Sequence, residues 1–278
     1  MIINADSAQL YRDLPILSAM PTAEERAAAE HRLFGVRDGA EPCSAAQWAA
    51  LAKAEIAATH NAGRLPILVG GTGLYLRTLL DGIAPVPAID PAVRADVRGA
   101  SVAENLAHLV TLDPVSAARL SPGDSARIAR ALEVVKSTGI TLGRWQARTS
   151  GGIGETIALR PLILLPPRAW LYARCNRRFG AMIDGGASKE ALVLAARHLD
   201  PQLPVMRAIG LAEMIAFASG ELDRTAAEAA GAQATRRYAK RQYTWFAHQP
   251  PDDWPRFASP LDQPGATDAA LALLGAAV

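Results

Sequence analysis

The sequence predicts an α/β fold in which a small parallel β-sheet is covered by helices and interrupted by a helical insertion. Two observations predict this fold. Three short segments are continuous apolar runs, as is typical of parallel strands buried on both faces, and polar residues, glycines or prolines follow them directly. Between residues 90 and 150 the chain shows helical periodicity punctuated by proline and glycine, with little strand character.

The expected strands are residues 1–5 (MIINA), 65–69 (LPILV) and 159–165 (LRPLILL). Between the first two, Ser44 is the expected N-cap of an alanine-rich helix that ends at Gly63. Strand, helix and strand in this order favour an α/β layer fold, whose sites open at the carboxyl ends of the strands. Asp6 and Thr72 both fall at such ends.

Most of the remaining chain is expected to be helical, over residues 170–218 and 223–247 and in a last helix at 267–277. Breaks are expected at Gly185-Gly186 and Asp200-Pro201. We therefore divide the chain into an α/β core, residues 1–90 and 150–278, and a helical insertion, residues 90–150.

Composition excludes several classes of protein. With 278 residues, 50% of them hydrophobic, and a net charge of only +2, the chain can bury a core and is not disordered. Cys43 and Cys175 are its only cysteines, which excludes a disulfide scaffold and a cysteine-based four-ligand zinc site. No apolar run is long enough to span a bilayer, and the start lacks a basic signal-peptide region. We expect a soluble cytoplasmic protein with no membrane partner.

Basic residues suggest a phosphate-bearing partner, because 25 of the 29 are arginine. GC-rich coding would explain this composition equally well, so clustering has to decide. The strongest cluster is the segment Thr235–Phe246 (TRRYAKRQYTWF), where two cation pairs at i, i+4 spacing alternate with aromatic residues. Such a helix can neutralise phosphates and support bases. A basic helix that packs through its aromatic side chains is the alternative.

Two further motifs follow the first two strands. Asp6 can act as a general base or magnesium partner, although a turn or helix-cap aspartate would look the same. The segment Gly70–Tyr75 (GGTGLY) lets the backbone approach a ligand closely and offers amides to an anion, or forms a tight strand-to-helix turn.

Isolated arginines are weaker signals. Arg127 and Arg130 lie one helical turn apart, which a solvated helix face also explains. Arg178 belongs to the segment LYARCNRRF, where arginines border an expected core and suit either a phosphate clamp or salt bridges. Arg207 is a charge inside an apolar segment, which favours an acidic or phosphate partner.

In combination these segments resemble the successive motifs of bacterial tRNA dimethylallyltransferases. The resemblance runs in order from Ile2 to Trp245 through INADSAQLYRDL, GRLPILVGGTGLYLRTLLDGI, DSARIARALEV, LYARCNRRF, PVMRAIG and TRRYAKRQYTWF. It implies a P-loop NTPase-like core and a helical insertion that grips the tRNA anticodon stem-loop. It also implies transfer of a dimethylallyl group from dimethylallyl diphosphate to the N6 amine of the adenosine 3′-adjacent to the anticodon, with Mg²⁺ as cofactor. We expect a monomer.

The resemblance also implies roles for single residues. Asp6 would take a proton from the adenine amine, Thr72 would contact tRNA at the active site, and Arg178 would act on the diphosphate, so these three are the expected catalytic residues. The implied tRNA-binding residues are Asp6, Ser7, Ala8, Gln9, Thr72, Arg94, Ala126, Arg127, Ile128, Ala129, Arg130, Arg207, Ala208, Ile209, Gly210, Lys240, Arg241, Gln242, Tyr243, Thr244, Trp245, Phe246 and Ala247.

Two departures from the family pattern matter. Residues 14–21 read LPILSAMP, where the family usually has a lysine-containing run, and no G-x-x-x-x-G-K-[ST] motif occurs anywhere. We therefore expect a chain that lacks the first strand and the P-loop, leaves part of its sheet uncovered, and is inactive or nearly so. The alternatives are a non-catalytic tRNA-binding remnant and a small-molecule kinase-like enzyme, and the intact basic helix argues against the second.

Overall fold

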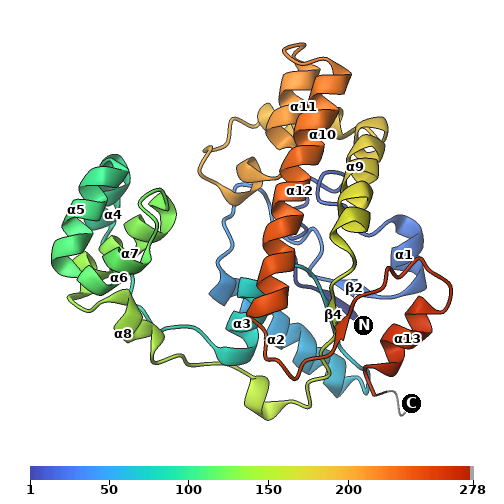
Figure 1. The fold of residues 1–278 in the computed structure, drawn as a ribbon, viewed down its shortest axis with the longest axis horizontal. Coiled ribbons are helices and arrows are strands. Elements are labelled where there is room, and N and C mark those ends of the chain that lie inside the picture. Colours follow the sequence, from blue (N-terminus) through green and yellow to red (C-terminus); the bar gives the residue numbers. More distant parts are fainter. Residues whose placement is uncertain (276–278) are drawn as a thin grey trace. The chain divides into compact units, whose positions relative to one another are not determined.

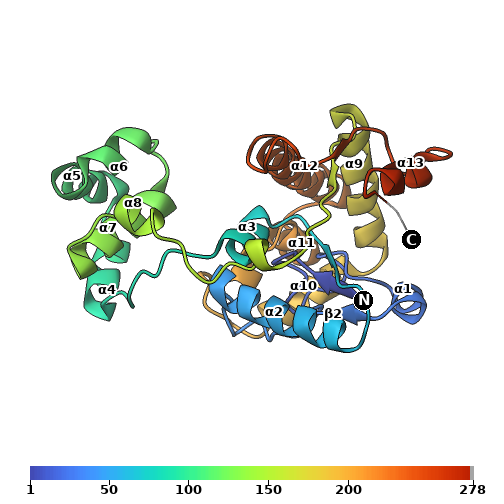
Figure 2. The ribbon, with the colours of Figure 1, turned by 90° about the horizontal axis from the view of Figure 1, so that it is seen from below.

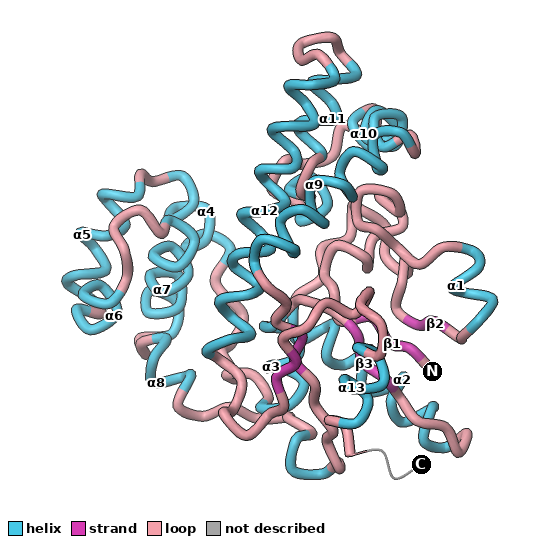
Figure 3. The backbone as a smooth tube through the Cα atoms, turned by 45° about the vertical axis from the view of Figure 1, so that its right-hand side comes forward, coloured by secondary structure: helices cyan, strands magenta, loops and turns pink. Residues whose placement is uncertain are grey.

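The computed structural model describes residues 1–275 of the chain (Figures 1–3). These residues form two compact units. The first, called here the sheet unit, is Met1–Leu79 together with the chain from Ile157 onward. The second, the helical unit, is Leu80–Thr156 and therefore begins earlier and ends later than the expected insertion.

The sheet unit is organised around a three-stranded parallel sheet (magenta in Figure 3). Its strands are β1 (Ile2–Asn4), β2 (His31–Arg32) and β3 (Ile67–Val69), in the order β2-β1-β3. Strand β1 pairs in parallel with both neighbours, so that Ile2 lies opposite His31 and Ile67. The first two expected strands are confirmed as β1 and β3. Strand β2 was not predicted, because it has only two residues and no apolar run.

Strand β3 differs from the expectation in its burial. The side chains of Leu65, Ile67 and Val69 are 72, 48 and 52% exposed, whereas Ile3 in β1 is completely buried. The prediction that this strand is covered on both faces is therefore wrong. Strand β3 forms an edge of the sheet and β1 forms its centre. An apolar sequence does not distinguish these two positions, so the exposure of β3 could not be predicted from it.

The third expected strand is shorter than predicted and lies outside the main sheet. Only β4 (Ile163–Leu164) is extended there, and it pairs in parallel with β5 (Arg256–Phe257) in a separate two-stranded sheet. Leu164 is 46% exposed while Ile163 is buried, so the apolar run alternates in burial and is not continuously covered.

Helix α2 anchors the first strand. It spans Ala45–Asn61 and begins with a capping box in which Ser44 and Gln47 exchange side-chain to backbone hydrogen bonds, as the sequence predicts at Ser44. Trp48 is fully buried, donates from its indole nitrogen to the carbonyl oxygen of Asn4 at 2.9 Å, and stacks on Tyr75 at 4.6 Å. These contacts fix the carboxyl end of β1, where Asp6 follows.

The other helices of the sheet unit are α1 (Ala23–Ala28), α3 (Gly73–Asp81), α9 (Arg168–Asp184), α10 (Ala187–Ala195), α11 (Leu211–Ala218), α12 (Arg224–His248) and α13 (Ala266–Ala272), with a 3₁₀ turn at Pro204–Arg207. Helix α12 packs along α9 (Figure 1). The helices approach closely because Gly231 has no side chain: a Cβ there would lie 1.9 Å from the ring of Phe179. The last helix was expected at residues 267–277, but α13 ends at Ala272 and residues 273–275 form a turn. Residues 276–278 lie outside the described part of the chain.

The helical unit contains α4 (Pro91–Gly99), α5 (Val102–Leu112), α6 (Pro114–Arg119), α7 (Ser125–Thr138) and α8 (Leu142–Gln146), followed by a 3₁₀ turn at Gly154–Thr156 (Figure 2). Leu109, Ile128 and Leu132 are fully buried at the centre of its own hydrophobic core. Backbone pairing between Ile83 and Ser150 joins the two ends of the unit. This pairing explains why the unit extends beyond the predicted helices.

Candidate functional site

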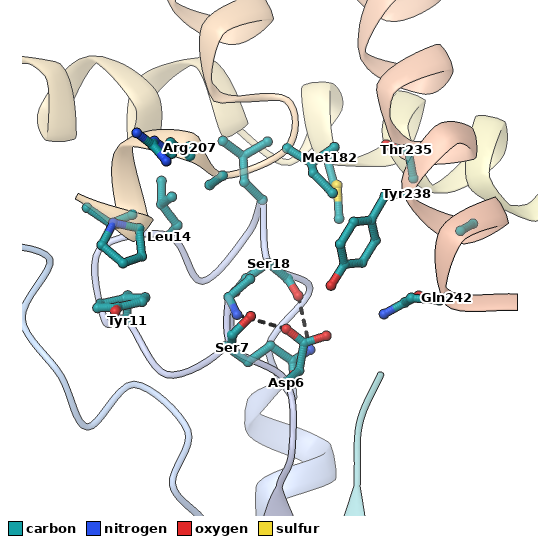
Figure 4. A pocket seen from close by; sticks show the side chains of 18 of the residues that line it. Asp6, Ser7, Tyr11, Leu14, Ser18, Met182, Arg207, Thr235, Tyr238 and Gln242 are labelled. Carbon is teal, nitrogen blue, oxygen red and sulfur yellow. Dashed lines mark hydrogen bonds between the residues drawn. The ribbon is translucent and has the colours of Figure 1, made fainter. Parts of the chain in front are cut away.

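The candidate site is a cavity of about 280 Å³ in the sheet unit (Figure 4). It lies where the loop after β1 faces α9, the 204–209 segment and α12. The predicted residues that line it are Asp6, Ser7, Ala8, Gln9, Arg178, Arg207, Ala208, Ile209 and Gln242. Tyr75 of the segment Gly70–Tyr75 also lines it, so the fold brings together five of the sequence segments that were singled out separately.

Asp6 is positioned by the buried side chain of Asn4. The Asn4 amide nitrogen donates to the carbonyl oxygens of Asp6 at 2.9 Å and Leu33 at 3.0 Å, and its amide oxygen accepts from the Asp6 backbone nitrogen at 2.7 Å. The Asp6 carboxylate accepts from the amide of Ala8 at 2.8 Å. The carboxyl group therefore points into the cavity from a fixed backbone.

Burial gives the Asp6 carboxyl the properties of a base. Withdrawal from water raises its pKa above the ordinary aspartate value, while the amides of Ala8 and Gln9 and the charge of Arg178 oppose the rise. A carboxylate with a raised pKa accepts a proton more readily than an exposed one.

Thr72 does not line the cavity. Its backbone nitrogen donates to the Ala5 carbonyl at 3.1 Å, and its hydroxyl oxygen accepts from the Ser7 nitrogen at 2.9 Å. The hydroxyl also lies 3.3 Å from the Ser7 hydroxyl. The threonine therefore ties the turn after β3 to the loop after β1, and its own amide is already satisfied within the chain.

The glycines of the GGTG turn allow the chain to approach itself. A Cβ at Gly71 would lie 2.0 Å from the Gln242 amide nitrogen, and one at Gly73 would lie 2.4 Å from the Trp245 ring. Gln242 also donates to the Gly71 carbonyl at 3.0 Å. The expectation that these glycines admit a ligand is therefore corrected: at Gly71 and Gly73 the space is filled by α12, as the tight-turn alternative implied.

The loop 14–21, which departs from the family pattern, is held from both sides. The Gln9 amide donates to the carbonyl oxygens of Ser18 and Ala19 at 3.0 and 2.8 Å. The Glu190 carboxylate accepts from the amides of Ile16 and Leu17 at 2.7 and 2.9 Å. The loop is thereby fixed as one wall of the cavity, and the Gln9 amide nitrogen is occupied by the chain itself.

Cations lie at the edge of the cavity and beyond it. Arg178 lines the cavity from α9, close enough to Asp6 to influence the pKa of its carboxyl. Arg207 also lines a second, open hollow together with Arg237 and Arg241 of α12 and Glu213 of α11. The fold thus gathers three arginines from two distant segments on one surface.

Helix α12 presents only part of its predicted segment outward. Lys240, Arg241 and Thr244 are exposed, whereas Gln242, Tyr243, Trp245, Phe246 and Ala247 are partly buried. Arg168 lies 4.9 Å from the centre of the Tyr243 ring, and Trp245 packs on Gly73 and Phe246. The cations therefore face outward while most aromatic side chains are partly buried, as the packing alternative implied, and phosphate binding by the helix stays a prediction.

The remaining predicted residues belong to other places in the fold. Gly210 is a buried N-cap of α11 with a φ of +87°. Arg94, Ala126 and Arg127 are exposed on the helical unit, and Arg130 there is partly buried. Ile128 and Ala129 are 0 and 5% exposed within its core, which leaves those two side chains out of reach of a ligand.

Several cavity residues were not predicted as site residues. Leu14, Leu17, Ser18, Met182 and Tyr238 all line the cavity. The leucines and Met182 resemble ordinary core residues in the sequence. Tyr238 belonged to the basic cluster, but the sequence does not show that its ring faces Asp6 and not solvent.

The described residues provide little for a magnesium ion. Within residues 1–275 no three His, Cys, Asp or Glu side chains form a group that could hold a metal. Asp6 is the only carboxylate that lines the cavity in this part of the chain. The residues present therefore do not fit a protein-built magnesium site, and Mg²⁺ stays a prediction.

Comparison with known proteins identifies the family of the chain. Residues 9–249 match the family described as IPP transferase. The chain belongs to the IPP transferase family. This transferase is 60% identical over 256 residues to a tRNA dimethylallyltransferase of Erythrobacter litoralis, which covers 92% of this chain and 81% of the relative.

Two solved structures resemble the transferase in fold. A full-length tRNA isopentenylpyrophosphate transferase of Bacillus halodurans aligns with a TM-score of 0.67 and 30% identity, over 99% of this chain and 87% of the other. A eukaryotic dimethylallyltransferase acting on tRNA aligns with a TM-score of 0.72 and 25% identity, over 88% of this chain and 62% of the other. The fold class is therefore an α/β fold with a small parallel sheet and many helices. No helix in residues 1–275 is long and apolar enough to cross a membrane.

Proposed function

We propose that this transferase moves a dimethylallyl group from dimethylallyl diphosphate to the N6 amine of the adenosine 3′-adjacent to the anticodon of tRNA. One observation carries the proposal: the fold brings the Asp6 carboxyl, with its raised pKa, and Arg178 into one cavity. The 60% identity to a protein named tRNA dimethylallyltransferase supports the choice of reaction.

The chemistry balances with the residues present. The amine nitrogen bonds to the terminal carbon of the dimethylallyl group as the carbon–oxygen bond to the diphosphate breaks. Asp6 accepts the proton that the amine loses, and the cationic Arg178 offsets the negative charge that gathers on the departing diphosphate. The target base has to leave its stack to reach Asp6 inside a cavity, which implies base flipping.

The tRNA would be held by exposed cations outside the cavity. Lys240 and Arg241 on α12 and Arg207 beside them are exposed and suit backbone phosphates. Arg94 and Arg127 of the helical unit are further candidates. A monomeric state, a cytoplasmic location and the use of Mg²⁺ belong to the same proposal, and each stays a prediction.

The test is a transfer assay with residues 1–278, radiolabelled dimethylallyl diphosphate, Mg²⁺ and a synthetic anticodon stem-loop. The relative from Erythrobacter litoralis serves as the positive control, and Asp6→Asn is the matched inactive variant. Label in the stem-loop that depends on Asp6 supports the proposal and contradicts the expectation of an inactive chain. Binding of the stem-loop without transfer favours the non-catalytic tRNA-binding alternative. The absence of both binding and transfer overturns the proposed function and this alternative together.

A further inference from the structure

The last residue of the central strand is an asparagine whose side chain bonds only to the backbone beside the candidate site. Asn4 ends β1, is completely buried and does not line the cavity. Its amide nitrogen donates to the carbonyl oxygens of Asp6 at 2.9 Å and Leu33 at 3.0 Å, and its amide oxygen accepts from the Asp6 nitrogen at 2.7 Å. Both amide hydrogens are therefore used within the chain, and the side chain itself touches no substrate.

This hydrogen-bond pattern explains why the side chain is an amide. A backbone N–H can only donate and a carbonyl oxygen can only accept, so the group at this position has to offer one acceptor and two donors. An aspartate would place a second carboxylate oxygen against the two carbonyl oxygens. An apolar residue, the usual occupant of a central strand, would leave the three backbone groups without these partners.

Backbone strain at Leu33 indicates that the pattern serves more than the strand. Leu33 has a φ of +63°, a left-handed conformation that is unfavourable for leucine, and its side chain is 4% exposed. Its carbonyl oxygen is the second acceptor of the Asn4 amide. Strain of this kind persists only where the surrounding structure enforces it, and it concentrates at active sites.

The hydrogen bonds of Asn4 leave the Asp6 backbone little freedom to turn. They hold its nitrogen and its carbonyl oxygen at once, and the carboxylate accepts from the Ala8 nitrogen at 2.8 Å. The backbone of Asn4 is itself held, because Trp48 donates to its carbonyl oxygen at 2.9 Å. The Asp6 carboxyl therefore keeps its direction into the cavity (Figure 4), and a displacement of about 1 Å at a reacting group can cost on the order of 10²-fold in rate.

We propose that Asn4 is a positioning residue, which acts on the transfer by holding the Asp6 carboxyl where it meets the reacting amine. The inference rests on the proposed function and adds the group that makes Asp6 an effective base. Because Asn4 acts through Asp6 alone, its removal slows the transfer step and leaves the binding of tRNA unchanged. An asparagine with a purely structural role would affect stability and not the rate of the folded protein.

The test is a double-mutant cycle of Asn4→Ala and Asp6→Asn. Single-turnover transfer rates and stem-loop dissociation constants at one fixed salt concentration are measured for the unaltered chain, both single variants and the double variant. Asn4→Ser is the conservative variant, because a serine hydroxyl accepts from the Asp6 nitrogen more weakly than an amide does and can donate to one carbonyl. It takes the place of Asn4→Ala in the cycle if that variant does not fold.

Thr59→Val is the matched control. Thr59 is also completely buried in the sheet unit, does not line the cavity, and donates from its hydroxyl to the Glu55 carbonyl at 2.6 Å. The change removes a buried hydrogen bond and keeps the shape of the side chain. Melting curves by circular dichroism verify that each variant is folded and measure its loss of stability.

The expected result is a loss of rate that depends on the carboxyl of Asp6. Asn4→Ala should slow transfer roughly 10- to 100-fold with an unchanged dissociation constant, and Asn4→Ser should recover part of the loss. In the Asp6→Asn background the change at Asn4 should cause no further loss, because the carboxyl that it positions is already gone. Thr59→Val should melt at a lower temperature and transfer at the unaltered rate.

Losses of rate that multiply in the double variant overturn the inference and leave the proposed function intact, because general damage to the cavity would produce that result. Folded Asn4→Ala or Asn4→Ser that transfers as fast as the unaltered chain also overturns it, as does an equal loss in Thr59→Val. An unaltered chain that neither binds nor modifies the stem-loop overturns the proposed function itself, and the inference with it.

Discussion

The Asp6 carboxyl group is partly withdrawn from water. This burial lowers the stability of the folded chain when the group is ionised, and it raises the pKa of the carboxyl, which makes it a better base. Its position after β1 could be predicted, because a polar residue after an apolar run marks the carboxyl end of a strand. Its surroundings could not, since the Asn4 side chain and Arg178 reach it only in the folded chain. The sequence alone therefore could not separate a base from a turn aspartate.

Replacement of Asp6 by asparagine is expected to separate stability from activity. The folded chain binds the Asp6 proton more tightly than the unfolded chain, so between the two pKa values the contribution of Asp6 to stability falls as pH rises. At pH 7 the variant should therefore melt no lower than the unaltered chain, and the difference should vanish below about pH 4. Transfer should fall roughly 10²- to 10⁴-fold.

Melting curves by circular dichroism at both pH values, with a pH–rate profile, test this expectation. In the unaltered chain the acid limb of the profile should lie above the pKa of an ordinary aspartate, and it should be absent from the residual activity of the variant. A variant that is clearly less stable at neutral pH would show that the carboxylate charge is a net stabilising group.

Helix α12 connects the strand ends to the outer surface of the sheet unit. The helix could be predicted, because residues 223–247 have helical periodicity. The structure confirms it as α12 at Arg224–His248. Which of its faces is buried could not be predicted. That depends on Gly71 and Gly73, which lie far away in sequence and leave room for Gln242 and Trp245. The burial of aromatic side chains in a basic helix thus follows from a turn in another segment.

Gly73→Ala is expected to destabilise the sheet unit by about 1–3 kcal/mol, because the new methyl group would overlap the Trp245 ring. Urea unfolding measures the change. Gly99→Ala is the matched control, since nothing lies within 4 Å of a Cβ at that helical position. The second change Trp245→Leu should recover part of the loss, and a Gly73→Ala variant as stable as the control would contradict the close contact.

Replacement of Lys240 and Arg241 by glutamine is expected to weaken stem-loop binding and to reduce its salt dependence. Each lost phosphate contact should flatten the slope of log K against log salt by roughly 0.7–0.9. Fluorescence anisotropy titrations at several salt concentrations give the slope. Arg224→Gln on the same helix is the control, because Arg224 pairs with Asp184 at 2.6 Å. Equal slopes in all three proteins would assign α12 a purely structural role.

At the scale of the whole molecule, the division into two units could be predicted but their limits could not. Periodicity indicated helices between residues 90 and 150, and the structure has α4 to α8 there. The unit nevertheless runs over Leu80–Thr156, because the backbone pairing of Ile83 with Ser150 joins two segments that have no helical pattern. Single backbone pairings of this kind leave no periodic signal in a sequence.

Leu132→Ala is expected to destabilise the helical unit selectively. Leu132 is fully buried in its core, so the cavity left behind should cost about 2–5 kcal/mol. Hydrogen exchange followed by mass spectrometry should show faster exchange in α4 to α7 and unchanged exchange in β1, α2 and α12. Equal acceleration in both units would mean that they unfold as one cooperative body.

The hydrogen bond between Gln242 and Gly71 joins residues that are 171 positions apart, and the ribosome makes them at different times. At 5–20 residues per second, the turn after β3 waits on the order of 10–35 s before α12 is synthesised. During that interval the helical unit, which is continuous in sequence, can already acquire its core. The turn after β3 lacks its contact with α12 until Gln242 has been synthesised, and during that interval the incomplete chain is exposed to chaperones and to aggregation.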